Sequence, residues 1–291
     1  MSDPRTLYVS DLDGTLLGDD GRISERSLTT IGALLERGDV AFTVATARSY
    51  ATARRAIAEL PIRLPMVVYS GAFAVDPDTG ERRWQVLFAP ATVPALLEEA
   101  VPLGLVPVVF WLQDGRERMS WVPGGEPSGL ARWLEARRGD PRLLPVERWD
   151  EVDTSVAFFV SVVGPAAALE RLVAALEGAP AGEDCALAFQ PSATDPDRSV
   201  LDVTAAAATK AEAVLRVARE AGFDRVEAFG DGPNDMPLFE EADEAHAVAN
   251  ADAAVLEAAT DVIPPNVEDG VAAYLVAEAA EGARDPEADG R

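Results

Sequence analysis

Two aspartates near the start of the chain, Asp11 and Asp13, are spaced to bind a cation or to transfer protons. They follow the apolar run 6–9 and precede Gly14. A continuous apolar run is typical of a buried parallel strand. Ligands of open α/β sheets bind beyond the carboxyl ends of the strands, so acids placed there indicate a site. An ordinary acidic turn is the alternative, because Asp and Gly are common in turns.

A second aspartate pair, Asp231 and Asp235, stands in a Gly-Asp-Gly-Pro-Asn-Asp segment after the apolar run 226–229. Taken alone, this pair could belong to a helix N-cap. Four carboxylates at one sheet edge would repel each other unless a hard cation joined them. Oxygen ligands without His or Cys suit Mg²⁺. We therefore expect the two pairs to form one magnesium site.

Two further polar residues, Thr46 and Lys210, are expected at the same edge of the sheet. Thr46 ends the apolar run 39–45, and Lys210 begins a predicted helix that lasts to residue 220. Strand ends and helix starts meet at the edge where α/β proteins place functional groups. This shared placement favours a functional site over unrelated turn residues.

The elements that would position these residues alternate between strand and helix in the first part of the chain. Apolar strands are expected at 6–9, 39–45 and 66–69, with amphipathic helices at 24–37 and 49–60. Such βαβ units imply a parallel sheet with right-handed crossovers. The same alternation resumes after residue 208, with strands at 226–229, 245–249 and 261–263 and helices at 209–220, 236–241 and 270–281.

From about residue 76 the pattern is that of mainly antiparallel strands with helices on one face. Strands are expected at 83–88, 106–110, 116–122, 156–163, 186–190 and 199–203, and helices at 92–103, from after Pro127 to 138, and at 165–176. This α+β layer indicates a second domain inserted into the first. We expect a discontinuous α/β core of residues 1–78 and 206–281, an inserted domain of residues 79–205 and a disordered acidic tail of residues 282–291.

The composition restricts the partners and the compartment. With 50 acidic and 25 basic residues and a net charge of −25, the chain is not expected to bind nucleic acid or an anionic membrane surface. It has no apolar stretch of the ~20 residues that cross a bilayer. Cys185 is the one cysteine, which excludes an intramolecular disulfide and favours a reducing, cytoplasmic location. His246 is the one histidine, and a structural role is expected for it.

Four segments resemble, in order and position, the four motifs of the haloacid dehalogenase (HAD) superfamily: residues 11–15, Thr46, Lys210 and residues 230–235. The insertion and the segment 266–272 resemble the Cof-type, or type IIB, capped phosphatases. The resemblance spans essentially the whole chain. It implies an α/β fold with a doubly wound parallel-sheet HAD-like core and an inserted α+β cap.

The resemblance also implies a reaction, the magnesium-dependent hydrolysis of a small soluble phosphomonoester such as a sugar phosphate. Asp11 would be the nucleophile that forms an aspartyl-phosphate, and Asp13 the general acid and base. Mg²⁺ would be bound by Asp11, the backbone carbonyl of Asp13 and Asp231, with Asp235 orienting the metal site or its waters. The partner implied is thus a small-molecule phosphate ester, with no nucleic acid or membrane.

The remaining family positions concern phosphate and substrate. The resemblance assigns phosphate contacts to Thr46, Lys210, Asn234 and backbone amides around Leu12. Arg48, two positions after the motif threonine, would either hold cap or substrate or form a structural ion pair.

The chain departs from the family pattern at two places. Ala47 replaces a common glycine and would be strained if the turn needed a positive φ angle. At the third strand end, Ser70 precedes Gly71 where the family often has asparagine, which bears on substrate contact.

Two other functions stay open at this point. A sugar phosphomutase would use the same fold but return the phosphoryl group to sugar. A phospho-acceptor signalling module would share an acidic pocket on a parallel sheet, but a second acid beside the nucleophile would shorten the life of its phosphoaspartate. The sequence predicts neither the particular substrate nor the oligomeric state.

Overall fold

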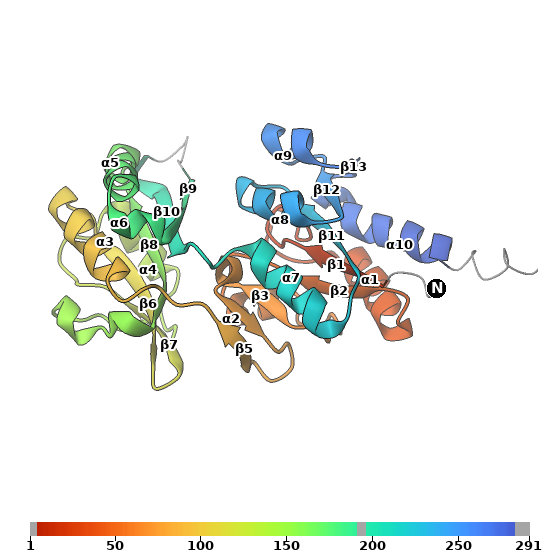
Figure 1. The fold of residues 1–291 in the computed structure, drawn as a ribbon, viewed down its shortest axis with the longest axis horizontal. Helices are drawn as coiled ribbons and strands as arrows, with labels where there is room; N and C mark the ends of the chain where they lie inside the picture. The colour runs from red at the N-terminus through yellow and green to blue at the C-terminus, as the bar shows by residue number, and fades with distance from the viewer. Residues whose placement is uncertain (1–4, 191–195, 283–291) are drawn as a thin grey trace, which may run out of the picture. The chain divides into compact units, whose positions relative to one another are not determined.

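The computed structural model describes residues 5–190 and 196–282, and the chain forms two compact units (Figure 1). One unit runs up to Gln85 and resumes at Thr209, and the other comprises Val86–Ala208. The sequence places the first boundary after residue 78. In the structure this boundary lies after Gln85, because strand β5 (Arg82–Gln85) pairs with β4 (Phe73–Val75) and so belongs to the first unit. The predicted tail begins at residue 282, which ends a helix, and residues 283–291 lie outside the described residues.

The first unit contains a five-stranded sheet in the order β13-β12-β11-β1-β2. Every pairing in this sheet is parallel. Strand β1 lies between β2 and β11, although β11 follows it by more than 200 residues. The strands are β1 (Thr6–Ser10), β2 (Ala41–Val44), β11 (Arg225–Gly230), β12 (Glu244–Val248) and β13 (Asp261–Ile263).

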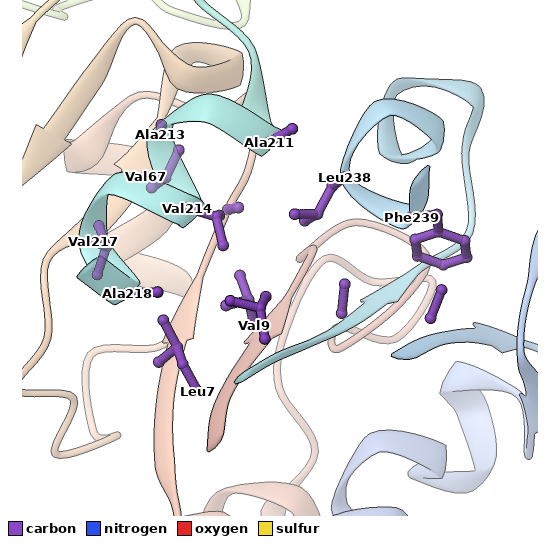
Figure 2. Packing of buried hydrophobic residues seen from close by; sticks show 14 of the residues in the cluster. Leu7, Val9, Val67, Ala211, Ala213, Val214, Val217, Ala218, Leu238 and Phe239 are labelled. Carbon is purple, nitrogen blue, oxygen red and sulfur yellow. The ribbon is translucent and has the colours of Figure 1, made fainter. Parts of the chain in front are cut away.

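Side chains along these strands alternate between two faces, because the side-chain period of a strand is two residues. Leu7 and Val9 pack against Val214 of α7 and Leu238 of α8 in one apolar cluster (Figure 2). Figure 1 shows α7 beside α8 and α1 beside α10. The helices of this unit are α1 (Glu25–Arg37), α2 (Tyr50–Ala56), α7 (Lys210–Ala221), α8 (Met236–Glu241), α9 (Ala253–Ala258) and α10 (Gly270–Gly282).

The third predicted strand differs from the expectation of a continuous parallel sheet. Strand β3 (Met66–Val68) pairs antiparallel with β4, and a parallel bridge between Ala45 and Val67 joins it to the end of β2. The sequence did not predict β4, since three residues are too few to show a period-two pattern.

The second unit contains an antiparallel sheet in the order β7-β6-β8-β10-β9. Its elements are α3 (Thr92–Ala100), β6 (Pro107–Gln113), β7 (Arg116–Ser120), α4 (Ser128–Glu135), β8 (Ala157–Gly164), α5 (Ala166–Glu177), α6 (Pro180–Glu183), β9 (Cys185–Gln190) and β10 (Ser199–Ala205). The predicted fold class, a parallel α/β core with an inserted α+β unit, is confirmed. Every helix in the described ranges is too short or too polar to cross a membrane.

Candidate active site

Asp11 and Lys210 form a buried ion pair at the carboxyl end of the core sheet. Asp11 directly follows β1, and its backbone N–H donates to the carbonyl of Phe229 on β11 at 2.9 Å. Lys210 is the first residue of α7, and its Nζ donates to Asp11 Oδ1 at 2.9 Å. The two side chains are only 8% and 1% exposed, so water screens their charges little.

The pKa values of this pair reflect its burial. Burial raises the pKa of Asp11 to about 7; Asp235 adds to the rise, while Lys210 opposes it. Burial would lower the pKa of Lys210, but Asp11 and Asp235 hold it above its ordinary value. The carboxylates therefore keep the ammonium charged.

Asp235 connects Lys210 to the loop that follows β11. Its Oδ1 accepts from Lys210 Nζ at 2.6 Å, and its Oδ2 accepts from the backbone N–H groups of Asp231 and Gly232, each at 3.1 Å. A Cβ at Gly230 would lie 2.7 Å from the Asp235 side chain, so glycine leaves the room that this carboxylate occupies. Asp235 thus fixes both the lysine and the loop.

Asp231 joins the loop after β11 to the loop after β1. Thr15 Oγ1 donates to Asp231 Oδ1 at 2.6 Å. Gly14 has a φ of +79°, and a Cβ there would lie 2.3 Å from Asp231 Oδ2. Burial, opposed by the bond from Thr15, raises the pKa of Asp231. Glycine at position 14 therefore allows both the turn and the close approach of the second aspartate.

Three carboxylates in this region fit a divalent cation. Oxygen atoms of Asp11, Asp231 and Asp235 all lie within 4.8 Å of one another. The donors are hard oxygens, and burial raises the pKa of Asp11 and of Asp231, so added positive charge would favour their ionised forms.

Asp13 and Arg48 pair beside this cluster. Arg48 donates from Nε to Asp13 Oδ2 at 2.7 Å and from Nη2 to Asp13 Oδ1 at 2.5 Å. Thr46 is buried, and its Oγ1 accepts from the backbone N–H of Arg48 at 3.2 Å. The threonine thus orients the residue that holds Asp13.

The turn after β3 packs against the start of α7. Gly71 in the 3₁₀ turn η1 (Tyr69–Gly71) has a φ of +106°, and a Cβ there would lie 2.2 Å from the carbonyl oxygen of Thr209. Thr209 caps α7, because its side chain accepts from the N–H of Glu212. Gly71 therefore lets the turn reach the backbone that carries Lys210.

Left-handed backbone occurs in the turn after β3 and not at Ala47. Ala47 is not among the residues with positive φ, so the turn does not impose on it the strain that a positive φ would have caused. Tyr69 and Ser70 instead have φ angles of 50° and 53°. The N–H of Ser70 donates to the Thr46 carbonyl at 3.0 Å, which links the turn to the end of β2. Left-handed backbone at non-glycine residues is uncommon and is often found at functional sites.

Two other expected residues lie on the loops of the cluster. The backbone N–H of Leu12 donates to the Asp11 carboxylate and lowers its pKa, because a hydrogen-bond donor favours the ionised form. Asn234 stands directly before Asp235. Its Oδ1 packs against Gly232, since a Cβ added at Gly232 would lie 2.6 Å from that oxygen.

Two asparagines that the sequence reasoning did not assign hold the loop after β1. Asn250 Nδ2 donates to the Gly14 carbonyl at 2.8 Å, and Asn266 Nδ2 donates to the Leu17 carbonyl at 2.9 Å. The N–H of Asn266 also donates to Asn250 Oδ1 at 2.9 Å. Asn266 lies in the segment noted for its resemblance, whereas no pattern marked Asn250.

Comparisons with known proteins agree with this architecture. A family model of haloacid dehalogenase-like hydrolases matches residues 8–275. The 5-amino-6-(5-phospho-D-ribitylamino)uracil phosphatase YitU of Bacillus subtilis is 24% identical over 276 residues, which are 92% of this chain and 96% of the relative.

Solved structures share the fold. A haloacid dehalogenase-like hydrolase from Bacteroides thetaiotaomicron has a TM-score of 0.75 at 23% identity, over 94% of this chain and 99% of the other. The HAD subclass IIB sugar phosphatase BT4131 has a TM-score of 0.71 at 20% identity, over 94% and 98% of the two chains. Since the family model spans both loops of the aspartate cluster and Lys210, the chain belongs to the haloacid dehalogenase-like hydrolase family.

Proposed function

We propose that this hydrolase is a magnesium-dependent phosphomonoesterase that acts on a small soluble phosphate ester, such as a sugar phosphate, through an aspartyl-phosphate on Asp11. The buried contact between Asp11 and Lys210, beside Asp231, is the observation that carries the proposal. The printed names of the relatives support the substrate class, because one is the phosphatase of a phosphoribityl compound and another a sugar phosphatase.

In the first step, a carboxylate oxygen of Asp11 attacks the phosphorus atom and the ester P–O bond breaks. The departing oxygen takes a proton from the Asp13 carboxyl group. Lys210 and Thr46 bind the equatorial phosphoryl oxygens, with Asn234 and the backbone amide of Leu12 as further donors.

In the second step, Asp13 acts as a base. Its carboxylate takes a proton from water, the water oxygen attacks phosphorus, and the bond from phosphorus to Asp11 breaks to release inorganic phosphate. Asp235 keeps Lys210 and the loop of Asp231 in place throughout.

Asp11, Asp231 and the backbone carbonyl of Asp13 would hold Mg²⁺, which would offset the negative charge between nucleophile and phosphate. Asp235 would orient this site.

The test uses p-nitrophenyl phosphate, whose leaving group needs little acid assistance. We expect Asp13→Asn to release one equivalent of nitrophenol in a burst and then to stall, with a phosphoryl group on Asp11 detectable by mass spectrometry. Asp11→Asn should abolish turnover. Asp39→Asn, which alters an exposed ion pair with Arg37, is the control and should retain it.

Several results would contradict the proposal. Turnover by Asp11→Asn at the wild-type rate would exclude the nucleophile, and full turnover after chelation of Mg²⁺ would exclude the metal. Phosphate transferred to a sugar instead of water would indicate the phosphomutase alternative.

A further inference from the structure

A second cluster of ionisable side chains lies on the sheet face opposite the apolar cluster of Figure 2. Val226 and Ala228 of β11 belong to that apolar cluster, so Glu227 between them projects to the other face. Glu244 and His246 of β12 lie on the same face as Glu227, since carboxylate and imidazole atoms of the three residues are all within 4.8 Å of one another.

Glu227 and Glu244 repel each other when both are ionised, which destabilises the fold unless a cation lies near them. Glu227 and Glu244 are direct neighbours in the parallel register of β11 and β12. Like charges directly opposite each other on one sheet face are destabilising. Arg225 Nη2 donates to Glu244 Oε1 at 2.6 Å and lies 3.7 Å from Glu227 Oε1, so one guanidinium serves both carboxylates.

The charges of the cluster are not balanced by Arg225 alone. In their ionised forms, Glu227 and Glu244 carry two negative charges against the one positive charge of the guanidinium that they share.

His246 is buried with both ring nitrogens available to bind a metal ion. Its side chain is 1% exposed, and neither ring nitrogen has a hydrogen-bond partner among the described residues. Its Nε2 lies 3.5 Å from Glu227 Oε2. Buried polar atoms without a protein partner are rare in folded proteins, so the two ring nitrogens of His246 are free to bind a ligand.

We propose that Glu227, Glu244 and His246 bind one first-row transition-metal dication, with Zn²⁺ the best fit, at a site separate from the aspartate cluster. An imidazole nitrogen with two carboxylate oxygens is a ligand set for Zn²⁺, whereas Mg²⁺ takes oxygen ligands. A dication would add positive charge beside two carboxylates that share one guanidinium. The two sites would thus select different metals through their donor atoms.

Further contacts suit such a site. Tyr274 Oη donates to Glu227 Oε2 at 3.1 Å, and its ring centre lies 4.2 Å from that of His246. These contacts orient two of the three ligands, as partners of metal ligands commonly do. The Glu244 side chain is 37% exposed and gives an ion access from solvent.

The proposed site is separated from the aspartate cluster along β11. Glu227 precedes Asp231 by four residues, which is roughly 13 Å of extended strand.

The experiment uses the full chain carrying Asp231→Asn, which weakens metal binding at the aspartate cluster. Chelator-treated protein is titrated with Co²⁺ and followed by visible absorption, with Zn²⁺ as competitor. We expect one Co²⁺ per chain, displaced by one Zn²⁺. Because His246 is the single histidine, Zn²⁺ should also shift one imidazole ¹⁵N resonance unambiguously.

Variants at the ligands provide the second readout. Tyr274→Phe removes the hydrogen-bond partner of a ligand, so we expect it to weaken Co²⁺ binding by about 10- to 100-fold. Glu244→Gln, at the rim of the cluster, removes a ligand itself and should weaken Co²⁺ binding more than that. Glu257→Gln, an exposed glutamate on α9, is the matched control and should bind as the parent does. Thermal unfolding in chelator checks that each variant is folded.

Three outcomes would overturn the proposal. One is the absence of Co²⁺ or Zn²⁺ binding in the folded Asp231→Asn chain. Another is binding that the folded Glu244→Gln variant retains at parental affinity. The third is an imidazole spectrum that Zn²⁺ leaves unchanged, which would assign His246 to a plain contact with Glu227.

Discussion

Arg48 holds both carboxylate oxygens of Asp13 in a two-point contact. The Asp13 side chain is 56% exposed and that of Arg48 23%, so this pair contributes little to stability. Its geometry instead fixes the direction of the proposed general acid, because a guanidinium presents its donors in a rigid fork.

We therefore expect Arg48→Lys to lower kcat/KM for an alkyl phosphate by about 10- to 100-fold, because general acid catalysis contributes roughly 10²- to 10⁴-fold and is only partly lost when the acid is misdirected. The melting temperature should barely change. An aryl phosphate, which needs less acid assistance, should show a smaller loss. An equal loss for both substrates would contradict the assignment.

Removal of the buried ammonium should destabilise the core unit. Lys210→Met leaves Asp11 and Asp235 without their shared cation, and we expect a loss of about 3–5 kcal/mol in the free energy of unfolding. Adding Asp11→Asn to that variant should restore part of the loss by removing one of the anions. Chemical denaturation in chelator measures both, and a double variant less stable than Lys210→Met would argue against charge as the cause.

The close approach of Gly71 to Thr209 predicts that alanine at position 71 destabilises the protein. Gly71→Ala should lower the free energy of unfolding by about 2–4 kcal/mol and reduce kcat, since relief of the clash would shift the start of α7. Gly38→Ala is the matched control, because Gly38 has a φ of +75° with nothing within 4 Å of an added Cβ. It should cost only the backbone strain, about 1 kcal/mol. Equal costs at the two positions would mean that crowding is unimportant.

Asp202 on β10 predicts a pH dependence of stability. Burial raises its pKa to about 6, with the bond from Ser161 opposing the rise. Between pH 4 and 6 the folded state holds this proton more tightly than the unfolded state, so stability is full below about pH 4 and falls as the pH rises. Relative to Asp202→Asn, the wild type should lose up to about 3 kcal/mol by pH 7. Denaturation curves of both proteins at pH 4 and 7 would show this; a constant difference would contradict it.

The sequence predicted the architecture well where motifs and apolar runs were long. The two aspartate pairs and Lys210, 199 positions after Asp11, were expected at one sheet edge from their places at strand and helix ends, and the structure brings Asp11, Asp231, Asp235 and Lys210 together. Parallel strands with continuous apolar runs carry a strong signal of this kind.

Features set by tertiary contacts were not predictable. The left-handed backbone of Ser70 and the contact of Gly71 with Thr209 depend on how the turn after β3 packs on α7, which no local pattern encodes. His246 was expected to be structural, and nothing in its neighbours along the chain indicated that Glu227 would be close to it.

The central position of β1 has a consequence for synthesis of the protein. One edge of β1 pairs with β2 early, but its other edge pairs with β11, which is translated more than 200 residues later. At translation rates of about 5–20 residues per second, that edge stays unpaired on the ribosome for roughly 10–40 s. We expect ribosome-bound chains stalled before β11 to be protease-sensitive in residues 5–85, and protection at that stage would contradict this.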